Sequence, residues 1–375
     1  MKIAMIGPSA PFRGGIAHYT TLLYRHLKKR HEVRFFAFKR QYPGWLFPGK
    51  TDIDPSLSPF AAPGLERVLD SMNPLTWIAT AQKIVQSRCD LVILPWWVSF
   101  WAPQFLTILS LVKHRSNAKI LFICHNVEAH ESRFFDKLLT RMVLRLGDYY
   151  IVHSKEDEVN LRSMLPGSII RRQFHPTYDA FNSDGIVSEP CQKAIAVKSP
   201  VILFFGFIRE YKGLKYLLAA MPAITDKIPL TLLIVGEFWK DKVVYLKMID
   251  DLGIGAHVKI VDAYVPNEDV DQYFNAADLV VQPYVSATGS GVVQMAFGFN
   301  KPVVATAVGS LPEIVEDGKT GFVVPPADPF AIARAVIRFF DENKAVTFGE
   351  NIKNQQYRFS WEYLVNGIEK LLDRN

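Results

Sequence analysis

The sequence predicts an α/β protein made of two doubly wound domains, each a parallel β-sheet with helices on both faces. Continuous apolar runs such as Lys119–Cys124 (KILFIC) alternate with segments of helical period, as expected for parallel strands that are covered on both faces. The alternation fades after Tyr178 and starts again at Val201. A length of 375 residues suits two or three domains, each with its own core.

We therefore expect an N-terminal domain over residues 1–177, a linker over 178–200 and a C-terminal domain over 201–355. Residues 356–375 are expected to form a closing helix, because five apolar residues share one helical face: Trp361, Leu364, Val365, Ile368 and Leu372.

The expected strands of the first domain lie at residues 2–6, 33–38, 91–94, 119–124 and 149–153. Those of the second domain lie at 201–207, 231–235, 258–261, 279–282 and 302–306. A helix is expected over 16–29, and another carries the stripe Leu214, Leu217, Leu218 and Met221. The Pro- and Gly-rich residues 39–73 are expected to form a long loop or insertion.

Residues 91–112 contain no charged side chain and are long enough to cross a bilayer as one helix. Pro95 and Pro103 interrupt this segment, and polar residues dilute it. We expect a buried strand, an aromatic turn and a core-facing helix instead of a membrane span.

The composition is that of a globular protein, with 49% hydrophobic and 21% charged residues. Cys89, Cys124 and Cys191 are scattered, so they predict neither a disulfide framework nor a metal site, and they fit a reducing cytoplasm. Met1 leads straight into a strand and Pro8 ends the apolar run, so no signal peptide is expected.

A Gly-rich turn between a strand and a helix contains Thr288, Gly289, Ser290 and Gly291. Such a turn presents free backbone N–H groups at the positive end of the helix, which suits a phosphate. Glycines let the backbone approach a ligand, and hydroxyls add donors. An ordinary strand-to-helix turn explains the residues equally well.

Three segments together resemble the retaining nucleotide-sugar glycosyltransferases of glycosyltransferase family 4, also called glycosyl transferases group 1: SAPFRGGIAHYT from Ser9, GFIREYKG from Gly206 and GSLPEIVEDGKTGFVVPP from Gly309. The resemblance implies the GT-B architecture, in which two Rossmann-like domains face each other across a cleft. It also implies an acceptor in the first domain, a nucleotide-sugar donor in the second, a final helix that crosses back, and neither cofactor nor metal.

Arg209 and Lys212 are the first catalytic candidates, because fixed cations stabilise the negative charge that develops on a departing diphosphate. The family places an arginine directly after the glycine, where this chain has Phe207. Residues two apart on an extended chain point the same way, so Arg209 can supply the guanidinium. The alternative is a solvated turn with ordinary surface charges.

The family's paired glutamates are missing, since no carboxylate occurs from Pro283 to Val303. Near the position of the second glutamate, which binds the nucleotide ribose, stands Gln294, followed by Met295. An amide can also bond ribose hydroxyls. The first glutamate would fall near Ala287 or Thr288.

His125 follows a strand and matches a family position that contacts the donor sugar; a structural histidine is the alternative. Its neighbours Glu128, His130 and Glu131 fit no metal motif, so no metal is expected. Further donor-side candidates follow strands or match family positions: Gly14, Gly15, Gly236, Tyr264, Val265 and Glu313. Glu313 can equally cap its own helix.

Residues 1–180 contain 24 Lys and Arg against 14 Asp and Glu, whereas the remainder contains 19 against 23. Arg133, Lys137, Arg141 and Arg145 recur on one helix beside apolar residues. This helix, near the aromatic run at 96–101, suits contact with an anionic membrane or a lipid-linked acceptor. A plain surface helix is the alternative. No nucleic-acid-reading motif accompanies the charge.

These features predict a metal-independent, hexosyltransferase-type enzyme that moves a sugar from a UDP- or GDP-type donor to a saccharide or lipid-linked acceptor, in cell-envelope polysaccharide or glycolipid synthesis. We expect it in the cytoplasm, with a peripheral position at the inner face of the membrane left open. The missing glutamates motivate an alternative, a non-catalytic GT-B subunit that binds a nucleotide sugar or a partner glycosyltransferase. A nucleotide-sugar epimerase is disfavoured by the block that starts at Gly309.

Overall fold

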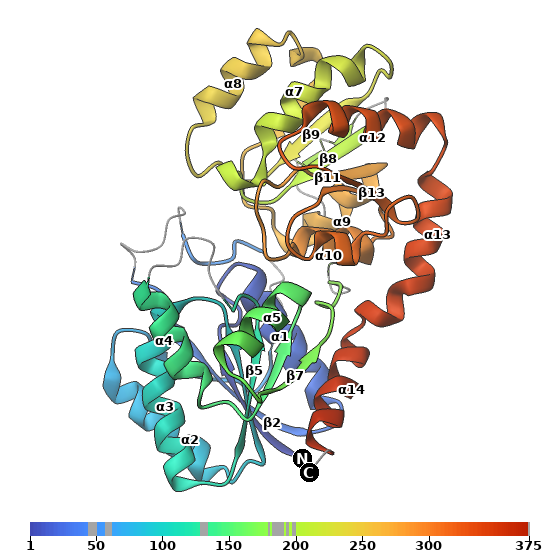
Figure 1. The fold of residues 1–375 in the computed structure, drawn as a ribbon. Coiled ribbons are helices and arrows are strands. Elements are labelled where there is room, and N and C mark those ends of the chain that lie inside the picture. Colours follow the sequence, from blue (N-terminus) through green and yellow to red (C-terminus); the bar gives the residue numbers. More distant parts are fainter. Residues whose placement is uncertain are drawn as a thin grey trace. The chain divides into compact units, whose positions relative to one another are not determined.

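A computed structural model describes residues 1–43, 51–56, 62–127, 134–178, 181, 191–192, 195–196 and 200–373. The chain divides into two compact units (Figure 1). Unit 1 comprises Met1–Asp54, Pro59–Phe174 and Trp361–Asn375, and unit 2 comprises Pro55–Ser58 and His175–Ser360.

Unit 1 alternates strands and helices. Its strands are β1 (Lys2–Gly7), β2 (Glu32–Arg40), β3 (Glu66–Asp70), β4 (Leu91–Trp96), β5 (Lys119–Cys124), β6 (Tyr149–Val152) and β7 (Ile169–Arg172). Its helices are α1 (Gly15–Lys28), α2 (Pro74–Gln86), η1 (Ser99–Trp101), α3 (Ala102–Arg115), α4 (Phe134–Leu144), α5 (Lys155–Met164) and α14 (Trp361–Leu372).

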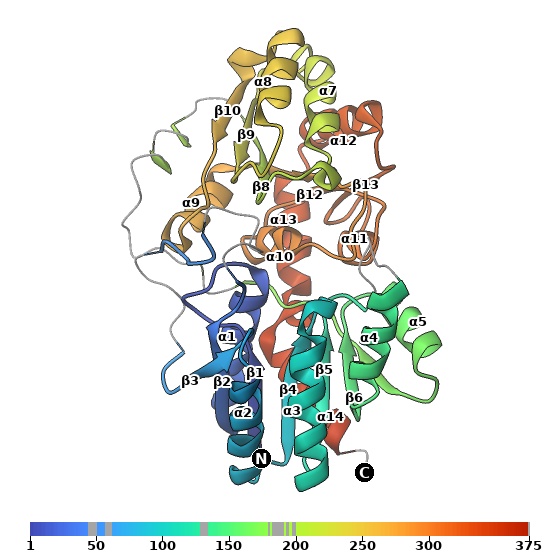
Figure 2. The ribbon, with the colours of Figure 1, turned by 90° about the vertical axis from the view of Figure 1, so that its left-hand side faces the viewer.

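All neighbouring strands of the unit 1 sheet pair in parallel, in the order β3-β2-β1-β4-β5-β6-β7. Alternate residues of each strand face opposite helix layers. Ala4, Ile6 and Val92 pack with α2 and α3 on one face, where Figure 2 shows these helices in front of the sheet. On the other face the Phe35 ring meets Tyr24 of α1, with 5.4 Å between centroids.

Unit 2 has the same alternation. Its strands are β8 (Val201–Phe205), β9 (Thr231–Val235), β10 (Val258–Val261), β11 (Leu279–Gln282), β12 (Val303–Thr306) and β13 (Gly321–Val324). Its helices include η2 (Glu210–Lys212), α7 (Leu214–Thr225), α8 (Lys242–Asp251), η3 (Gly255–His257), α9 (Asn267–Ala276), α10 (Gly291–Gly298), α11 (Leu311–Ile314), α12 (Pro329–Asp341), α13 (Ala345–Gln355) and η4 (Gln356–Phe359).

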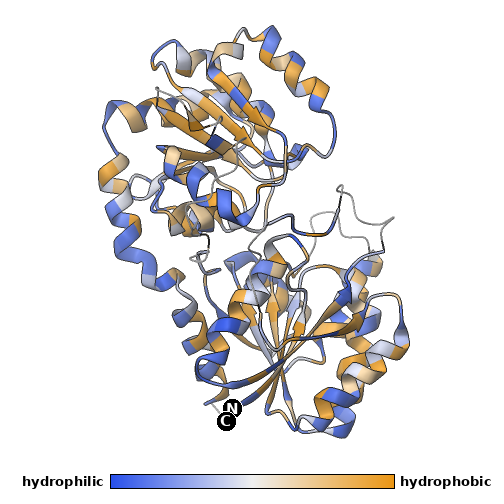
Figure 3. Cartoon of the chain, turned by 180° about the vertical axis from the view of Figure 1, so that it is seen from behind, coloured by the Kyte–Doolittle hydropathy of each residue, from blue (hydrophilic) through white to orange (hydrophobic). Residues whose placement is uncertain are grey.

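The unit 2 sheet is also fully parallel, in the order β10-β9-β8-β11-β12-β13. Helices α7, α8 and α12 cover one face and α9 and α10 lie on the other (Figure 1). The predicted stripe of α7, from Leu214 to Met221, is fully buried in the first of these layers. Figure 3 shows that the strands of both sheets are mainly hydrophobic. The prediction of two doubly wound parallel-sheet domains is confirmed.

All ten strands predicted from the sequence are present, with ends that differ by at most two residues. The missed strands β3, β7 and β13 each lie at a sheet edge. The prediction of one long loop over residues 39–73 was therefore wrong at Glu66–Asp70, which is β3. An edge strand has one neighbour and tolerates charge, and Glu66 accepts hydrogen bonds from Arg34 (3.1 Å) and Lys83 (2.7 Å).

The apolar segment 91–112 folds as expected, as β4, the aromatic turn η1 and α3. Trp96 and Trp101 are buried in the unit 1 core. In the described part of the chain, no helix has both the length and the apolar composition that a membrane span needs.

The last helix, α14, belongs to unit 1. Trp361 is buried, and its ring meets Tyr19 and His26 of α1 at centroid distances of 5.1 and 5.6 Å. His31 Nε2 lies 2.9 Å from Glu369 Oε1 at the other end of the helix, within hydrogen-bond distance. Unit 1 thus ends at Phe174 and resumes at Trp361. From the sequence, we expected the first domain to end at residue 177 and the closing helix to begin at residue 356. Most of the predicted linker, 178–200, lies outside the described residues.

We expect Trp361→Ala to destabilise unit 1 by about 3–5 kcal/mol, because it removes a large side chain from a packed core. Calorimetric melting should show a lower transition temperature. Phe330→Ala is the matched control, because Phe330 is 74% exposed on α12 and should change stability little. Equal shifts in the two variants would refute the docking of α14 through Trp361.

Candidate functional site

The carboxyl ends of β8 and β11 form the candidate site in unit 2. These strands are neighbours in the sheet, and the strand order reverses between them. Ligands of open α/β sheets bind in the crevice at such a switch point. The segments that follow are Gly206–Gly213 after β8 and Pro283–Ser290 after β11, and they hold most of the donor-side residues expected from the sequence.

Backbone contacts fix the two loops against each other. The Val285 N–H donates to the Tyr211 carbonyl at 2.7 Å. Gly213 has φ +71°, and a Cβ at this position would lie 1.9 Å from the Pro283 oxygen. Only glycine allows this approach without displacing backbone. The loops after β8 and β11 therefore form one rigid rim.

Lys212 is the buried cation of this rim, with 9% of its surface exposed. Its Nζ lies 5.4 Å from the centroid of the Tyr284 ring and close to the backbone of Gly206. Burial lowers the pKa of Lys212, and the charge of Arg209 lowers it further, whereas Tyr211 raises it. In the described residues no carboxylate forms an ion pair with this ammonium group.

Arg209 is exposed and rests on two aromatic rings. Its Cζ lies 4.5 Å from the Trp239 ring centroid and 5.1 Å from that of Tyr211. Among the described residues it forms no ion pair, and the adjacent Glu210 pairs with Lys215 at 3.4 Å. Two positive charges that form no ion pair with a carboxylate of the described residues therefore lie at the end of β8.

The Gly-rich loop leads into α10, as predicted. The Ser290 hydroxyl caps this helix by accepting a hydrogen bond from the Val293 N–H (3.3 Å), and it also lies 3.2 Å from the Tyr284 hydroxyl. Ser290 is therefore engaged within the protein. The Thr288 carbonyl accepts from the Ser310 N–H at 3.0 Å, while Gly291 is exposed at the helix start.

The structure buries Gln294 completely, so its placement does not support the predicted contact with a ribose. Neither amide atom has a hydrogen-bond partner among the described residues. The next residue, Met295, keeps part of its side chain at the surface. Met295 is thus accessible where Gln294 is not, because successive side chains on a helix point in directions about 100° apart.

The remaining donor-side candidates lie on other loops of unit 2. Gly236 follows β9 with φ +152°, and a Cβ there would lie 2.1 Å from the Gly206 oxygen, so it brings the two loops together. Tyr264 and Val265 follow β10 and are half-buried. Glu313 lies in the first turn of α11, and no side chain caps that helix.

In unit 1, Gly14 and Gly15 begin α1. Gly14 has φ +110°, and the first turn of α1 carries neither a side-chain cap nor an acidic residue. This helix start suits an anion. His125 follows β5, and its N–H donates to the Trp96 carbonyl (2.8 Å).

His125 belongs to a ring cluster at the carboxyl edge of the unit 1 sheet. Its ring meets Tyr19 edge-on with 4.5 Å between centroids, and His153 at 5.3 Å. Burial lowers the pKa of His153 to about 4, so the ring is neutral at pH 7 and Nδ1 donates to the Gln173 carbonyl at 2.8 Å.

No group of three or more His, Cys, Asp and Glu side chains that could hold a metal occurs within the described ranges. Glu128, His130 and Glu131 lie outside those ranges.

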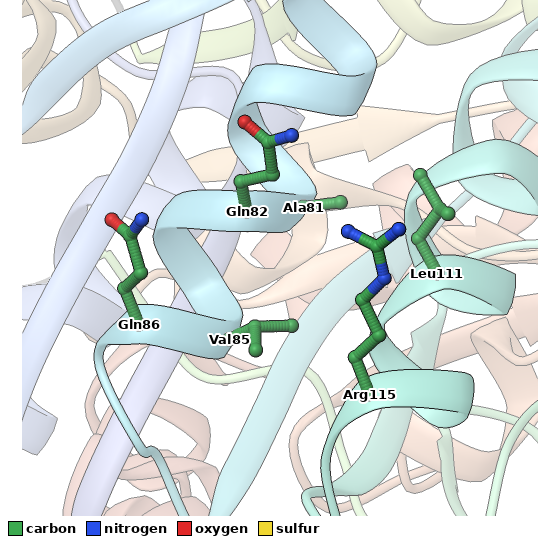
Figure 4. Close-up of a pocket in the computed structure, with 6 residues that line it drawn as sticks. All are labelled: Ala81, Gln82, Val85, Gln86, Leu111 and Arg115. Atoms are coloured by element: carbon green, nitrogen blue, oxygen red, sulfur yellow. The ribbon is translucent and has the colours of Figure 1, made fainter.

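A groove of about 350 Å³ lies between α2 and α3 (Figure 4), lined by Ala81, Gln82, Val85, Gln86, Leu111 and Arg115. These residues occupy the last turns of helices that lead into β4 and β5, so the groove is at the amino ends of the strands. Ligands of this fold class bind at the opposite ends. The groove also contains none of the predicted residues, and we do not assign it.

Comparison with known proteins gives a family match for the second part of the chain. Residues 199–342, which include the whole rim, match the family described as Glycosyl transferases group 1. This region, less than half of the chain, is thus similar to that family. The recognition made from the three sequence segments is confirmed.

The relatives of this chain include D-inositol 3-phosphate glycosyltransferase of Corynebacterium glutamicum (strain R), which is 30% identical over 174 residues, or 44% of this chain and 41% of the relative. The first curated relatives are matched over less than half of their own length. The GDP-mannose-dependent alpha-(1-6)-phosphatidylinositol monomannoside mannosyltransferase of Mycolicibacterium smegmatis is 25% identical over 87% of this chain and 85% of the relative.

Solved structures share the fold. Sucrose-phosphate synthase from Thermosynechococcus elongatus has a TM-score of 0.71 at 21% identity, covering 100% of this chain and 98% of that one. Anabaena Alr3699/HepE, in complex with UDP and glucose, has a TM-score of 0.73 at 17% identity and full coverage of both chains. The fold of this chain is GT-B.

Three residues at the carboxyl edges of the sheets were missed from the sequence: Tyr284, Trp239 and His153. His153 directly follows β6, and Tyr284 follows β11 after one intervening residue. Trp239 lies in the loop after β9. Their position after predicted strands was the available signal. Their contacts with Lys212, Arg209 and His125 arise from packing that spacing does not reveal.

We expect Lys212→Met to raise the melting temperature by a few degrees, because it removes a buried charge that lacks a carboxylate partner and keeps the apolar stem. The pKa of Lys212 is lower in the folded protein than in the unfolded chain. At pH values between these two pKa values, the unfolded chain therefore binds more protons than the folded protein. Wild-type stability therefore rises with pH in that interval, and the advantage of the variant should shrink there.

Lys215→Met is the matched control, because Lys215 is paired with Glu210 and its side chain is 43% exposed. It should not stabilise the protein. A lower melting temperature for Lys212→Met would contradict the assignment of Lys212 as a charge held at a cost in stability.

Proposed function

We propose that this protein is a retaining, metal-independent glycosyltransferase that transfers a sugar from a UDP- or GDP-linked donor. The observation that carries the proposal is the pair of cations at the switch point of unit 2. Lys212 is buried and Arg209 rests on aromatic rings, and neither forms an ion pair in the described residues. A bound diphosphate would supply the missing negative charge.

The chemistry of sugar transfer explains why such cations are useful. The bond between the anomeric carbon and the diphosphate oxygen breaks, and its electron pair stays on the diphosphate. The acceptor oxygen bonds to the anomeric carbon, and the acceptor hydroxyl gives up its proton. Charge on the phosphate oxygens therefore grows toward the transition state, where fixed cations in a site of low dielectric lower the barrier.

The flanking elements suit the other parts of a sugar nucleotide. The exposed start of α10 at Gly291 lies at the end of the loop that packs against the Lys212 segment, and a helix start adds positive potential for phosphate. Tyr264, a half-buried aromatic residue on the loop after β10, offers apolar surface to a nucleoside. We place the donor in unit 2 on these grounds.

We place the acceptor in unit 1, with Gly14, Gly15 and His125 as the residues that approach it or the donor sugar. Two relatives are named for an inositol phosphate and a phosphatidylinositol mannoside, which supports a phosphorylated or lipid-linked acceptor and a role in cell-envelope glycolipid or polysaccharide synthesis. The absence of carboxylates from Pro283 to Val303 leaves the Gly-rich loop without a carboxylate nucleophile or a carboxylate metal ligand, which supports a reaction that uses neither at this loop.

We expect Arg209→Ala and Lys212→Ala each to lower turnover by about a hundredfold or more, as the loss of one group that stabilises developing charge does elsewhere. Donors are first found by thermal stabilisation with a panel of sugar nucleotides. Release of UDP or GDP is then measured with and without acceptor, and EDTA should leave it unchanged.

Lys215→Ala is the control, since Lys215 is in the same segment and paired with Glu210. Near-normal turnover of both site variants would refute the anion site. Tight binding of a sugar nucleotide with no turnover over a broad acceptor set would favour the non-catalytic subunit instead.

Helix α4 supports a second element of the proposal, a peripheral position on the cytoplasmic face of an anionic membrane. Phe135, Leu138 and Met142 are 73, 48 and 44% exposed and follow i, i+3, i+7 spacing. Lys137 and Arg141 are exposed on the same helix, and Arg145 is exposed directly after its end, whereas Arg133 lies outside the described residues. An apolar ridge beside basic residues is the pattern of a helix that lies in a membrane interface.

We expect the triple variant Phe135→Ser/Leu138→Ser/Met142→Ser to lose binding to vesicles of phosphatidylglycerol and phosphatidylcholine, because it removes the apolar ridge and keeps the charge. Co-sedimentation measures the bound fraction. Val243→Ser/Val244→Ser is the matched control, because both valines are exposed on α8 of unit 2. Equal loss in the control, or no wild-type binding, would refute the membrane surface.

A further inference from the structure

The loop after β9 packs directly against the loop that carries Arg209. The Ile208 N–H donates to the Glu237 carbonyl (2.9 Å) and the Trp239 N–H donates to the Ile208 carbonyl (3.4 Å). These bonds make an isolated parallel β-bridge between Ile208 and Phe238. The residues that follow the bridge on each side, Arg209 and Trp239, are therefore neighbours across it.

The side chains follow this geometry. Arg209 Cζ lies 4.5 Å from the centroid of the Trp239 ring. Phe238, one residue earlier, has the opposite orientation, with its ring 5.7 Å from Lys242 Nζ and 5.8 Å from the Tyr245 centroid. The loop after β9 thus gives one aromatic ring to Arg209 and turns the adjacent ring away from it.

The Trp239 ring is itself held in place. The centroid of the Phe207 ring lies 5.1 Å from that of Trp239, and the centroid of the Tyr264 ring lies 6.0 Å from that of Phe207. Phe207 stands at the position where the family pattern has an arginine. Both Phe207 and Arg209 contact Trp239, which agrees with their pointing the same way along an extended chain. Phe207, at the end of the strand, therefore packs against the Trp239 ring, and the arginine of this segment is Arg209, two residues further on.

Two carboxylates of this region are paired with other cations. Glu210 pairs with Lys215 (3.4 Å), and Asp262 pairs with Lys242 (2.8 Å). A carboxylate beside Arg209 would hold it but would also neutralise it and compete with a phosphate. An aromatic face holds a guanidinium with little loss of its charge.

We infer that Trp239 is a positioning residue, which holds the Arg209 guanidinium in the orientation that receives a diphosphate. This inference rests on the proposed function and assigns Trp239 no contact with the reacting atoms. Its contribution to diphosphate binding is predicted to pass entirely through Arg209.

The test is a double-mutant cycle on the affinity for UDP and GDP, measured by calorimetry with Trp239→Leu, Arg209→Ala and the double variant. Trp239→Leu removes the ring and should weaken binding of the nucleoside diphosphate by about three- to tenfold. In the Arg209→Ala background the same substitution should have no further effect. Trp239→Phe keeps an aromatic face and should recover part of the loss.

Phe238→Leu is the matched control, because it changes a ring of the same loop that lies over Lys242, and it should leave affinity unchanged. Melting temperatures identify variants that bind weakly because they unfold. Additive effects of Trp239→Leu and Arg209→Ala, or full affinity in Trp239→Leu, would overturn the positioning role. Full affinity in Arg209→Ala, or no binding of either nucleotide by the wild type, would instead refute the proposed anion site.

Discussion

A buried, unneutralised ammonium group is the constraint on which the rest of unit 2 depends. Lys212 gains no carboxylate from the described residues, so the surrounding chain must hold it by shape. The left-handed backbone conformation of Gly213 lets α7 start close to the Pro283 carbonyl. The hydrogen bond between Val285 and Tyr211 joins the same two loops. These backbone features fix the cation before any ligand arrives, so little reorganisation is needed on binding.

The central strands could be predicted because burial on both faces leaves a direct signal in the sequence, an uninterrupted apolar run such as β5. The edge strands carried a weaker signal. β3 and β7 contain charged residues, since an edge needs a partner on one side only. The return of α14 to unit 1 followed from its apolar face and the family resemblance together, and the buried Trp361 gives the physical reason.

The cations and glycines of the candidate site could be predicted from the sequence. The aromatic side chains that contact the cations could not. Lys212 and the Gly-rich loop follow predicted strands, so topology alone brings them to one edge. The ring under Arg209 comes from a different loop, 30 residues later, and depends on a single β-bridge. The position of Gln294 was harder to predict. This polar side chain is completely buried, because a shift of one residue on a helix decides whether a side chain faces the core or the surface.

Aromatic rings and carboxylates solve different problems at an anion site. A carboxylate partner would stabilise Arg209 or Lys212 in the empty protein, but the incoming diphosphate would then have to displace it, and the gain on binding would fall by the same amount. Rings at 4.5 Å from Arg209 and 5.4 Å from Lys212 orient the cations while leaving their charge available. Under the proposed function, a bound diphosphate would relieve the cost of burying Lys212, which has no carboxylate ion-pair partner among the described residues. Binding energy would then be concentrated at the group on which negative charge grows during transfer.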